Sequence, residues 1–115
     1  METEKNYLRN FLHDDILELG FDEDTIDIAL DAFIESMETS MPQLLEAIEN
    51  NDNENIRFHA HTLKGTFANF KNETFRNIAD LFKKMEEAAK NNTENEHINE
   101  TLAQIKKLSE KWLKI

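Results

Sequence analysis

The sequence predicts an all-α protein, an antiparallel four-helix bundle with an additional N-terminal helical segment. Only two glycines and one proline occur in 115 residues, whereas a sheet needs more turn residues. Apolar residues recur at spacings of three and four along four stretches. The connections between these stretches are short, which favours antiparallel neighbours. Residues 1–115 are therefore expected to form one domain with a modest core.

The additional segment runs from Glu4 to about Leu19 and is predicted to be either one helix or two short pieces. Its apolar stripe ends at Gly20, a residue that often follows the last turn of a helix. Asp22 is then a candidate N-cap for the first long helix. The stripe consists of Tyr7, Phe11, Ile16 and Leu19.

The next stretch, which reaches about Asn50, is predicted to be either one long kinked helix or two helices. Pro42 lies where a first-turn proline is natural, after Ser40 as a possible N-cap. The spacing of the apolar residues indicates one continuous buried face. That face consists of Ile26, Leu30, Phe33, Ile34, Met37, Leu44, Leu45 and Ile48.

The second half of the chain contains three predicted helices. The asparagine-rich run 50–53 predicts a turn into a helix over about 55–72. A short turn leads to a further helix, which is broken at 91–93, and Thr93 with Glu96 forms a capping-box pattern for the last one. The apolar positions of the last two helices are Phe75, Ile78, Ala79, Phe82, Met85 and Ala89, then Ile98, Leu102, Ile105, Leu108, Trp112 and Ile115.

One histidine of the 55–72 helix is predicted to point at solvent. At about 100° per residue, His61 lies roughly 200° from the centre of the apolar arc. Lys64, Gly65 and Ala68 fall on the same side as His61, because they are three, four and seven residues further on. The arc itself consists of Ile56, Leu63, Phe67 and Phe70.

Gly65 is unexpected in the middle of a helix, where glycine costs about 1 kcal/mol relative to alanine. No helix end is expected there, since the apolar arc continues to Phe70. We interpret Gly65 as leaving room for a second molecule to approach His61. Lys64 would supply a compact positive charge to an anion held on the imidazole.

The run Ala-His-Thr-Leu-Lys-Gly at residues 60–65, followed by Asn69, resembles the signature of the histidine-containing phosphotransfer (HPt) domain. The likeness extends over roughly Leu17 to Lys90. It departs from the family pattern at Phe67, where a small residue is usual, and at Lys71, where glycine is frequent. Because Phe67 lies on the buried arc, we expect it to fill core space and to leave the exposed face intact.

The resemblance implies that His61 carries a phosphoryl group between proteins. His61 would accept the group from an aspartate of a response-regulator receiver domain and pass it to another receiver in a phosphorelay. Receiver domains or a hybrid sensor histidine kinase would be the partners, and their docking would be transient. The chain shows no glycine-rich phosphate loop for ATP, so we expect a carrier and not a kinase, with no cofactor.

The other expected site residues surround His61. In the implied role Lys64 would steady the phosphoryl oxygens, Gly65 would keep the approach open, and Asn69 would contribute a hydrogen bond. The remaining contributors would be a second cation and two apolar docking residues, namely Arg57, Phe58 and Ala68.

Two alternatives stay open at this stage. The chain is alternatively the phosphorylatable domain of a chemotaxis-type histidine kinase, or a helical scaffold that only binds a partner. A metal site is not expected: His59 and His61 point in opposite directions on a helix, whereas a helical metal pair needs an i, i+4 spacing. We expect His59 to be half-buried packing and His97 to be a surface residue.

Charge is divided unevenly along the chain, which has a net charge of −11. Residues 1–55 hold sixteen acidic and two basic residues, whereas residues 56–115 hold eight acidic and eleven basic ones. This balance argues against a nucleic-acid partner. No cysteine, signal peptide or membrane-spanning stretch is recognisable. We therefore expect a cytoplasmic protein. We also expect a monomer, because no apolar stripe is left over for a dimer.

Overall fold

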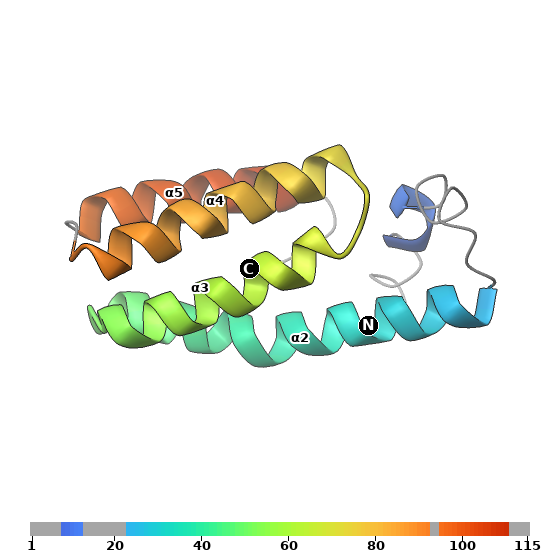
Figure 1. The fold of residues 1–115 in the computed structure, drawn as a ribbon, viewed down its shortest axis with the longest axis horizontal. Helices are drawn as coiled ribbons and strands as arrows, with labels where there is room; N and C mark the ends of the chain where they lie inside the picture. The colour runs from blue at the N-terminus through green and yellow to red at the C-terminus, as the bar shows by residue number, and fades with distance from the viewer. Residues whose placement is uncertain (1–7, 13–22, 93–94, 111–115) are drawn as a thin grey trace.

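Four long helices form the bundle in the computed structural model, which describes residues 8–12, 23–92 and 95–110. Helix α2 spans Glu23–Glu49, α3 spans Asn53–Ala68, α4 spans Glu73–Lys90 and α5 spans Asn95–Ser109. They run alternately in opposite directions, and each packs against the next one along the chain (Figure 1). The largest interface joins α3 and α4. The described residues contain no strand, so the predicted all-α bundle is confirmed.

Helix α2 is one continuous helix of 27 residues with Pro42 inside it, which decides between the two predicted possibilities. Ser40 therefore lies in the helix interior, where it is buried, and does not cap a second helix. The proline ring removes one backbone donor, but Pro42 itself is exposed on the outer face. The buried face runs unbroken past it, because Met41 and Leu44 continue the stripe.

An aspartate and an asparagine define the two ends of α3, Asp52 through its side chain and Asn69 through its backbone. Asp52 accepts a hydrogen bond from the backbone N–H of Asn55 at 3.3 Å, and thereby caps the first turn. At the other end, the backbone N–H of Asn69 donates to the carbonyl of Gly65 at 3.2 Å. Lys71 lies in the turn beyond this cap, so it does not extend the helix. Asn72 then caps α4 by accepting from the N–H of Phe75 at 3.1 Å.

Phenylalanine rings fill the space beneath α3. Phe67 is fully buried at 0% exposure, as its place on the arc predicted. Its ring centroid lies 5.1 Å from that of Phe33 on α2, 5.0 Å from Phe75 and 5.6 Å from Phe82 on α4. Aromatic pairs of this kind contribute about 0.5–1.5 kcal/mol beyond their buried area. The cluster therefore fixes α3 against both neighbouring helices.

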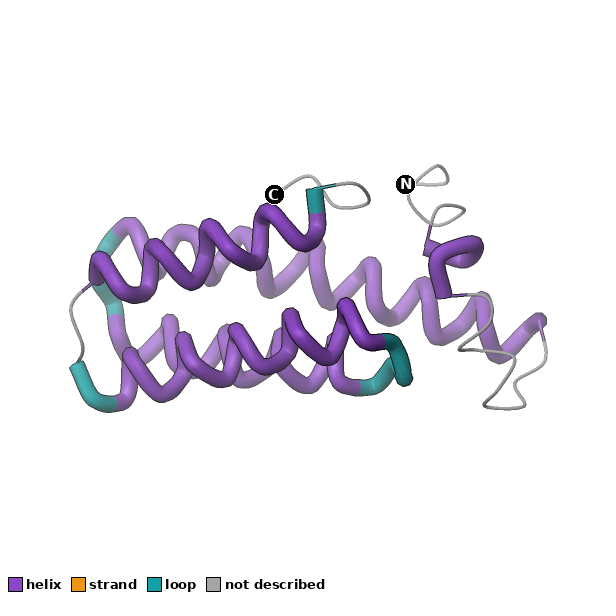
Figure 2. Tube along the Cα trace, turned by 90° about the horizontal axis from the view of Figure 1, so that it is seen from above, coloured by secondary structure: helices purple, strands orange, loops and turns teal. Residues whose placement is uncertain are grey.

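A short helical piece at residues 8–12 lies beside the N-terminal part of α2 (Figures 1 and 2). Leu8 and Leu12 are buried, and the ring of Phe11 lies 6.0 Å from that of Phe75. Arg9 also forms an ion pair with Asp27 of α2. The predicted additional segment is thus present in part. The remaining residues of its predicted stripe and the candidate cap at Asp22 lie outside the described residues.

The last helix agrees with its predicted stripe except at one position. Ile98, Leu102 and Ile105 are buried, but Leu108 is 40% exposed. Ser109 takes the buried place instead, and its hydroxyl donates to the carbonyl of Ile105 at 2.7 Å. Trp112, Ile115 and the capping residue Thr93 lie outside the described residues. No helix among the described residues is long and apolar enough to cross a membrane.

Candidate functional site

The exposed face of α3 carries His61, whose side chain is 65% exposed. The opposite face of the helix is buried through Ile56, Ala60, Leu63 and Phe67. The alternation follows from the 3.6-residue period of the helix. The predicted division of α3 into a core face and a histidine face is therefore confirmed, and His59 is half-buried as expected.

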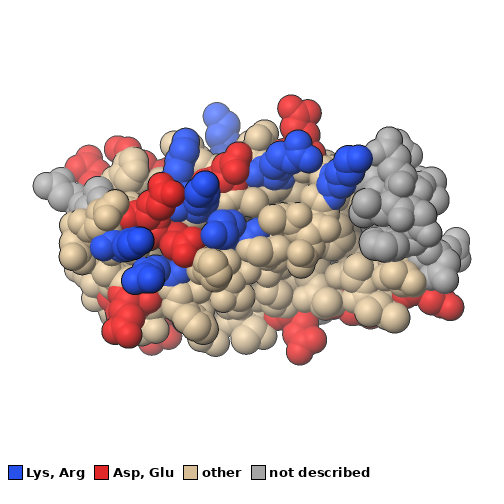
Figure 3. All heavy atoms as spheres, in the orientation of Figure 1, with Lys and Arg blue, Asp and Glu red and all other residues tan. Residues whose placement is uncertain are grey.

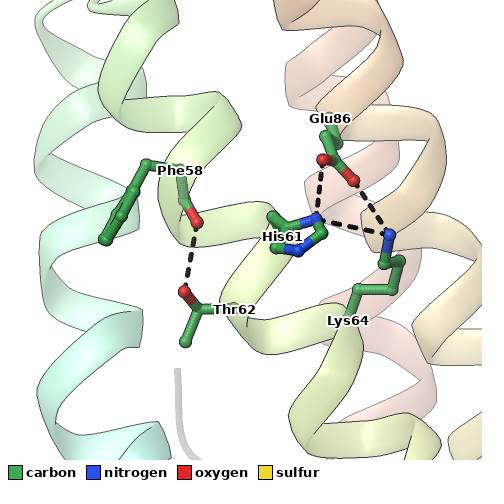
Figure 4. Close-up of polar contacts among 5 residues, drawn as sticks. All are labelled: Phe58, His61, Thr62, Lys64 and Glu86. Atoms are coloured by element: carbon green, nitrogen blue, oxygen red, sulfur yellow. Dashed lines mark hydrogen bonds and ion pairs between the residues drawn. The ribbon is translucent and has the colours of Figure 1, made fainter.

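His61 is held by a carboxylate from the neighbouring helix. Its Nδ1 lies 2.8 Å from Oε2 of Glu86 on α4. The ammonium of Lys64, one turn further along α3, lies 3.1 Å from Oε1 of the same carboxylate. Figure 4 shows the three side chains converging between α3 and α4. One carboxylate thus binds both the imidazole and the lysine, one with each oxygen.

Glu86 is ionised near neutral pH. Burial raises the pKa of Glu86, but its hydrogen bonds and charge attraction with Lys64 and His61 outweigh burial and hold the pKa below its ordinary value. An ionised carboxylate has no proton to donate. The short contact with His61 therefore requires a proton on Nδ1 of the imidazole.

This proton fixes the tautomer of the neutral ring. With Nδ1–H donating to Glu86, Nε2 keeps its lone pair. Lys64 Nζ lies 3.4 Å from Nδ1, and it cannot donate to a nitrogen that already carries a proton, so its hydrogen bond goes to Glu86. A ring with one nitrogen anchored and the other free is suited to nucleophilic attack through Nε2.

Arg57 and Phe58 lie next to His61, as expected. Both line a shallow hollow of about 410 Å³ on the face of α3, and Glu54, Thr62 and Glu86 complete its lining. Phe58 is 65% exposed, whereas most of the phenylalanines that the structure describes are buried. Its backbone carbonyl accepts a hydrogen bond from the hydroxyl of Thr62 at 3.2 Å. The ring itself thus presents an apolar surface one turn before His61.

Gly65 lies one turn after His61 on an open surface. A methyl group built at Gly65 would meet no heavy atom within 4 Å, once the helix's own backbone is left aside. The packing of this chain therefore does not require glycine there. The absence of a side chain leaves the surface beside the imidazole flat, which is consistent with the interpretation drawn from the sequence.

Ala68 and Asn69 are exposed, but they lie further along α3 and do not line the hollow around His61. Both line a second hollow with Lys64, between the end of α3 and the beginning of α4. The backbone of Asn69 caps α3. The structure thus brings Lys64, Gly65, Arg57 and Phe58 close to His61 and places the other two nearer the helix end.

Glu86 is the residue of this site to which sequence reasoning assigned no role. In the sequence it appears only as a carboxylate beside the buried Met85, at the edge of the apolar stripe of α4. A charged residue at that edge must face either solvent or a neighbouring helix. Its partner became evident only when α4 was seen to pack against α3 with Glu86 opposite His61.

The fold and this site define a helical bundle that presents an anchored histidine on one exposed helix face. The family model of the Hpt domain matches residues 29–111, which include α3, α4, α5 and most of α2. The chain belongs to the Hpt domain family. No curated protein and no solved structure is significantly similar to it. Membership of this family implies a phosphotransfer role in two-component signalling.

Proposed function

We propose that His61 accepts a phosphoryl group from the phosphorylated aspartate of a receiver domain and passes it to an aspartate of another receiver. The observation that carries this proposal is the anchored and exposed imidazole, with Nδ1 bound to Glu86 and with no hydrogen bond from Nε2 to a residue that the structure describes. Family membership supports the same chemistry. The chain would act as a carrier in a phosphorelay, with the receivers as its transient partners.

The transfer begins with attack of the Nε2 lone pair on the phosphorus atom of the aspartyl phosphate. The N–P bond forms as the bond from phosphorus to the aspartate oxygen breaks, and the aspartate leaves as a carboxylate. The imidazole becomes positively charged, and Glu86 stabilises this charge through Nδ1–H at 2.8 Å. The reverse sequence returns the group to a second receiver aspartate.

Charge stabilisation at the phosphoryl group comes mainly from the partner, because phosphoryl transfer depends on positioning and electrostatics. The receiver would supply the divalent ion. On this chain, Lys64 lies close to the ring, with Nζ 3.4 Å from Nδ1. Its ammonium would bind the phosphoryl oxygens during transfer. Arg57 would be a second cation, and Asn69 would contribute a hydrogen bond from the edge of the face.

The docking contact would be made by Phe58, Ala68 and the flat surface at Gly65. His61, Lys64 and Glu86 all come from one chain, so a monomer holds the complete arrangement. We accordingly propose a monomeric carrier that acts in the cytoplasm, where it meets its receivers.

The test is phosphotransfer from a panel of phosphorylated receiver domains to the wild type, to His61→Gln and to His97→Gln as the matched control. His97 is an exposed histidine on α5, a helix that does not pack against α3. We expect an acid-labile, alkali-stable label on the wild type and the control, and none on His61→Gln. Absence of label on the folded wild type from every receiver would overturn the proposal. Label from an ATP-binding kinase domain alone would favour the chemotaxis-type alternative.

A further inference from the structure

A basic hollow of about 390 Å³ lies between the end of α3 and the beginning of α4. Lys64 is shared between this hollow and the His61–Glu86 pair, because its ammonium bonds to Glu86 while the side chain lines the hollow. Four basic residues and one acidic residue line the hollow. They are Lys64, Lys71, Arg76 and Lys83, with Asp80.

Three of the four cations of the hollow are available to a partner, because only Lys64 is paired with Glu86. The structure records no ion pair for Lys71, Arg76 or Lys83 with any residue that it describes. The side chains of all three are exposed. The uncharged part of the lining is mostly apolar and consists of Ala68, Phe70 and Ala79, with Asn69. An incoming carboxylate could therefore reach several cations without first displacing an internal ion pair.

Positive charge at this place contrasts with the rest of the molecule. The chain has a net charge of −11, and α2 carries eight acidic residues with no lysine or arginine. Figure 3 shows Lys and Arg side chains gathered over α3 and α4, with some Asp and Glu among them, whereas the charged side chains along the edge formed by α2 are Asp and Glu. A hollow on the α2 flank of α3 has no charged residue in its lining. The basic charge is thus concentrated on one flank of the histidine face.

We propose that the basic hollow binds an acidic surface segment of the receiver domain that docks on His61, and so fixes the orientation of the receiver on the histidine face. This inference rests on the proposed function. Ala68 at the hollow lies two helical turns from His61, about 10 Å along the axis. A partner that buries about 800 Å² on this chain covers a patch wide enough to include both.

Charge complementarity identifies the partner's chemistry. An acidic protein segment meets local cations here, while the carboxylates of α2 repel it from the opposite flank. Both effects favour one orientation of the receiver. A long polyanion such as RNA would extend beyond the hollow and be repelled by the rest of a chain of net charge −11. A short acidic segment of a protein surface meets mainly the hollow and therefore fits it better.

The experiment uses a variant with Lys71→Gln, Arg76→Gln and Lys83→Gln combined. The matched control replaces Lys84, Lys106 and Lys107 by Gln, which removes the same charge from exposed positions that line neither hollow. Each protein is labelled in two ways, by a phosphorylated receiver and by the small phosphoryl donor phosphoramidate. Receiver labelling is measured as kcat/KM at several salt concentrations, and circular dichroism checks the fold.

We expect the hollow variant to lose roughly tenfold in kcat/KM with the receiver at low salt, because a steering field is weakened. It should also show a flatter salt dependence, while its phosphoramidate labelling equals that of the wild type. A receiver rate equal to that of the control would overturn the inference and leave the proposed function intact. Equal losses with phosphoramidate would also overturn it, since the hollow would then serve His61 itself. Failure of the wild type with every receiver would remove both proposals.

Discussion

The inner and outer faces of α3 make different contacts, although the residues of both faces come from the same sixteen-residue helix. The inner face is packed against α2 and α4 by Phe67 and its ring neighbours. The outer face carries His61, which bonds to Glu86 of α4, and Gly65, beside which the surface is open. We therefore expect stability and the proposed phosphotransfer to depend on different faces of α3, so substitutions on the two faces should affect different measurements.

The largest expected effect on stability belongs to the inner face. Phe67→Ala removes a fully buried ring and should lower the free energy of unfolding by about 3–5 kcal/mol. Urea denaturation followed by circular dichroism measures this loss. Phe58→Ala is the matched control, because Phe58 is 65% exposed, and its unfolding free energy should stay within about 0.5 kcal/mol of the wild type. Equal losses in the two variants would contradict the division of the faces.

Glu86→Gln tests the connection between α4 and the outer face. The amide keeps the size of the side chain but loses its charge, so the imidazole cation that forms during transfer is less stabilised. We expect the phosphotransfer rate from a receiver to fall by roughly 10- to 100-fold, which corresponds to about 1.4–2.7 kcal/mol. Stopped-flow transfer kinetics measure it.

Glu87→Gln is the control for this experiment, since Glu87 is the exposed neighbour on α4. The ¹⁵N chemical shifts of His61 add a readout that does not depend on rate. In the wild type they should report a proton on Nδ1, and in Glu86→Gln a mixture of tautomers. Unchanged shifts together with an unchanged rate would show that Glu86 does not position the ring.

Two substitutions at Gly65 should sharpen the comparison, because Gly65→Gln tests how closely a partner approaches and Gly65→Ala tests stability. A methyl group at Gly65 meets no heavy atom within 4 Å, and alanine is favoured over glycine in a helix interior by about 0.5–1 kcal/mol. The variant should therefore be more stable to urea by that amount. Gly65→Gln should slow transfer from a receiver while phosphoramidate labelling stays unchanged. Transfer to Gly65→Gln at the wild-type rate would mean that the partner does not approach Gly65 closely.

The periodicity of apolar residues was enough to predict the helices and the core, because the bundle buries one stripe from each helix. The same helical periodicity placed His61 at the surface and Phe67 in the core. It could not decide whether Pro42 interrupts α2, since the stripe on both sides of Pro42 is consistent with either outcome. It also could not pair Glu86 with His61, which are 25 residues apart and meet only through the packing of α4 on α3.

The smallest expected effect concerns pH and the stability that Glu86 contributes. The folded pKa of Glu86 lies below its ordinary value of 4.5, since Lys64 and His61 outweigh the effect of burial. The contribution is therefore fully present above the unfolded pKa and is lost as pH falls through the folded one. Because the two partners are partly exposed, it should amount to less than about 1 kcal/mol.

Urea denaturation of the wild type and of Glu86→Gln at a series of pH values measures this contribution. The wild type should be the more stable protein at neutral pH, and its advantage should shrink as the pH falls from about 4.5 through the lower pKa that Glu86 has in the folded protein. Glu87→Gln serves again as the control and should show no such convergence with the wild type. If the wild type stays more stable than Glu86→Gln after Glu86 is protonated, the difference comes from packing of the side chain and not from its charge. The outer face would then contribute to stability through packing, as the inner face does.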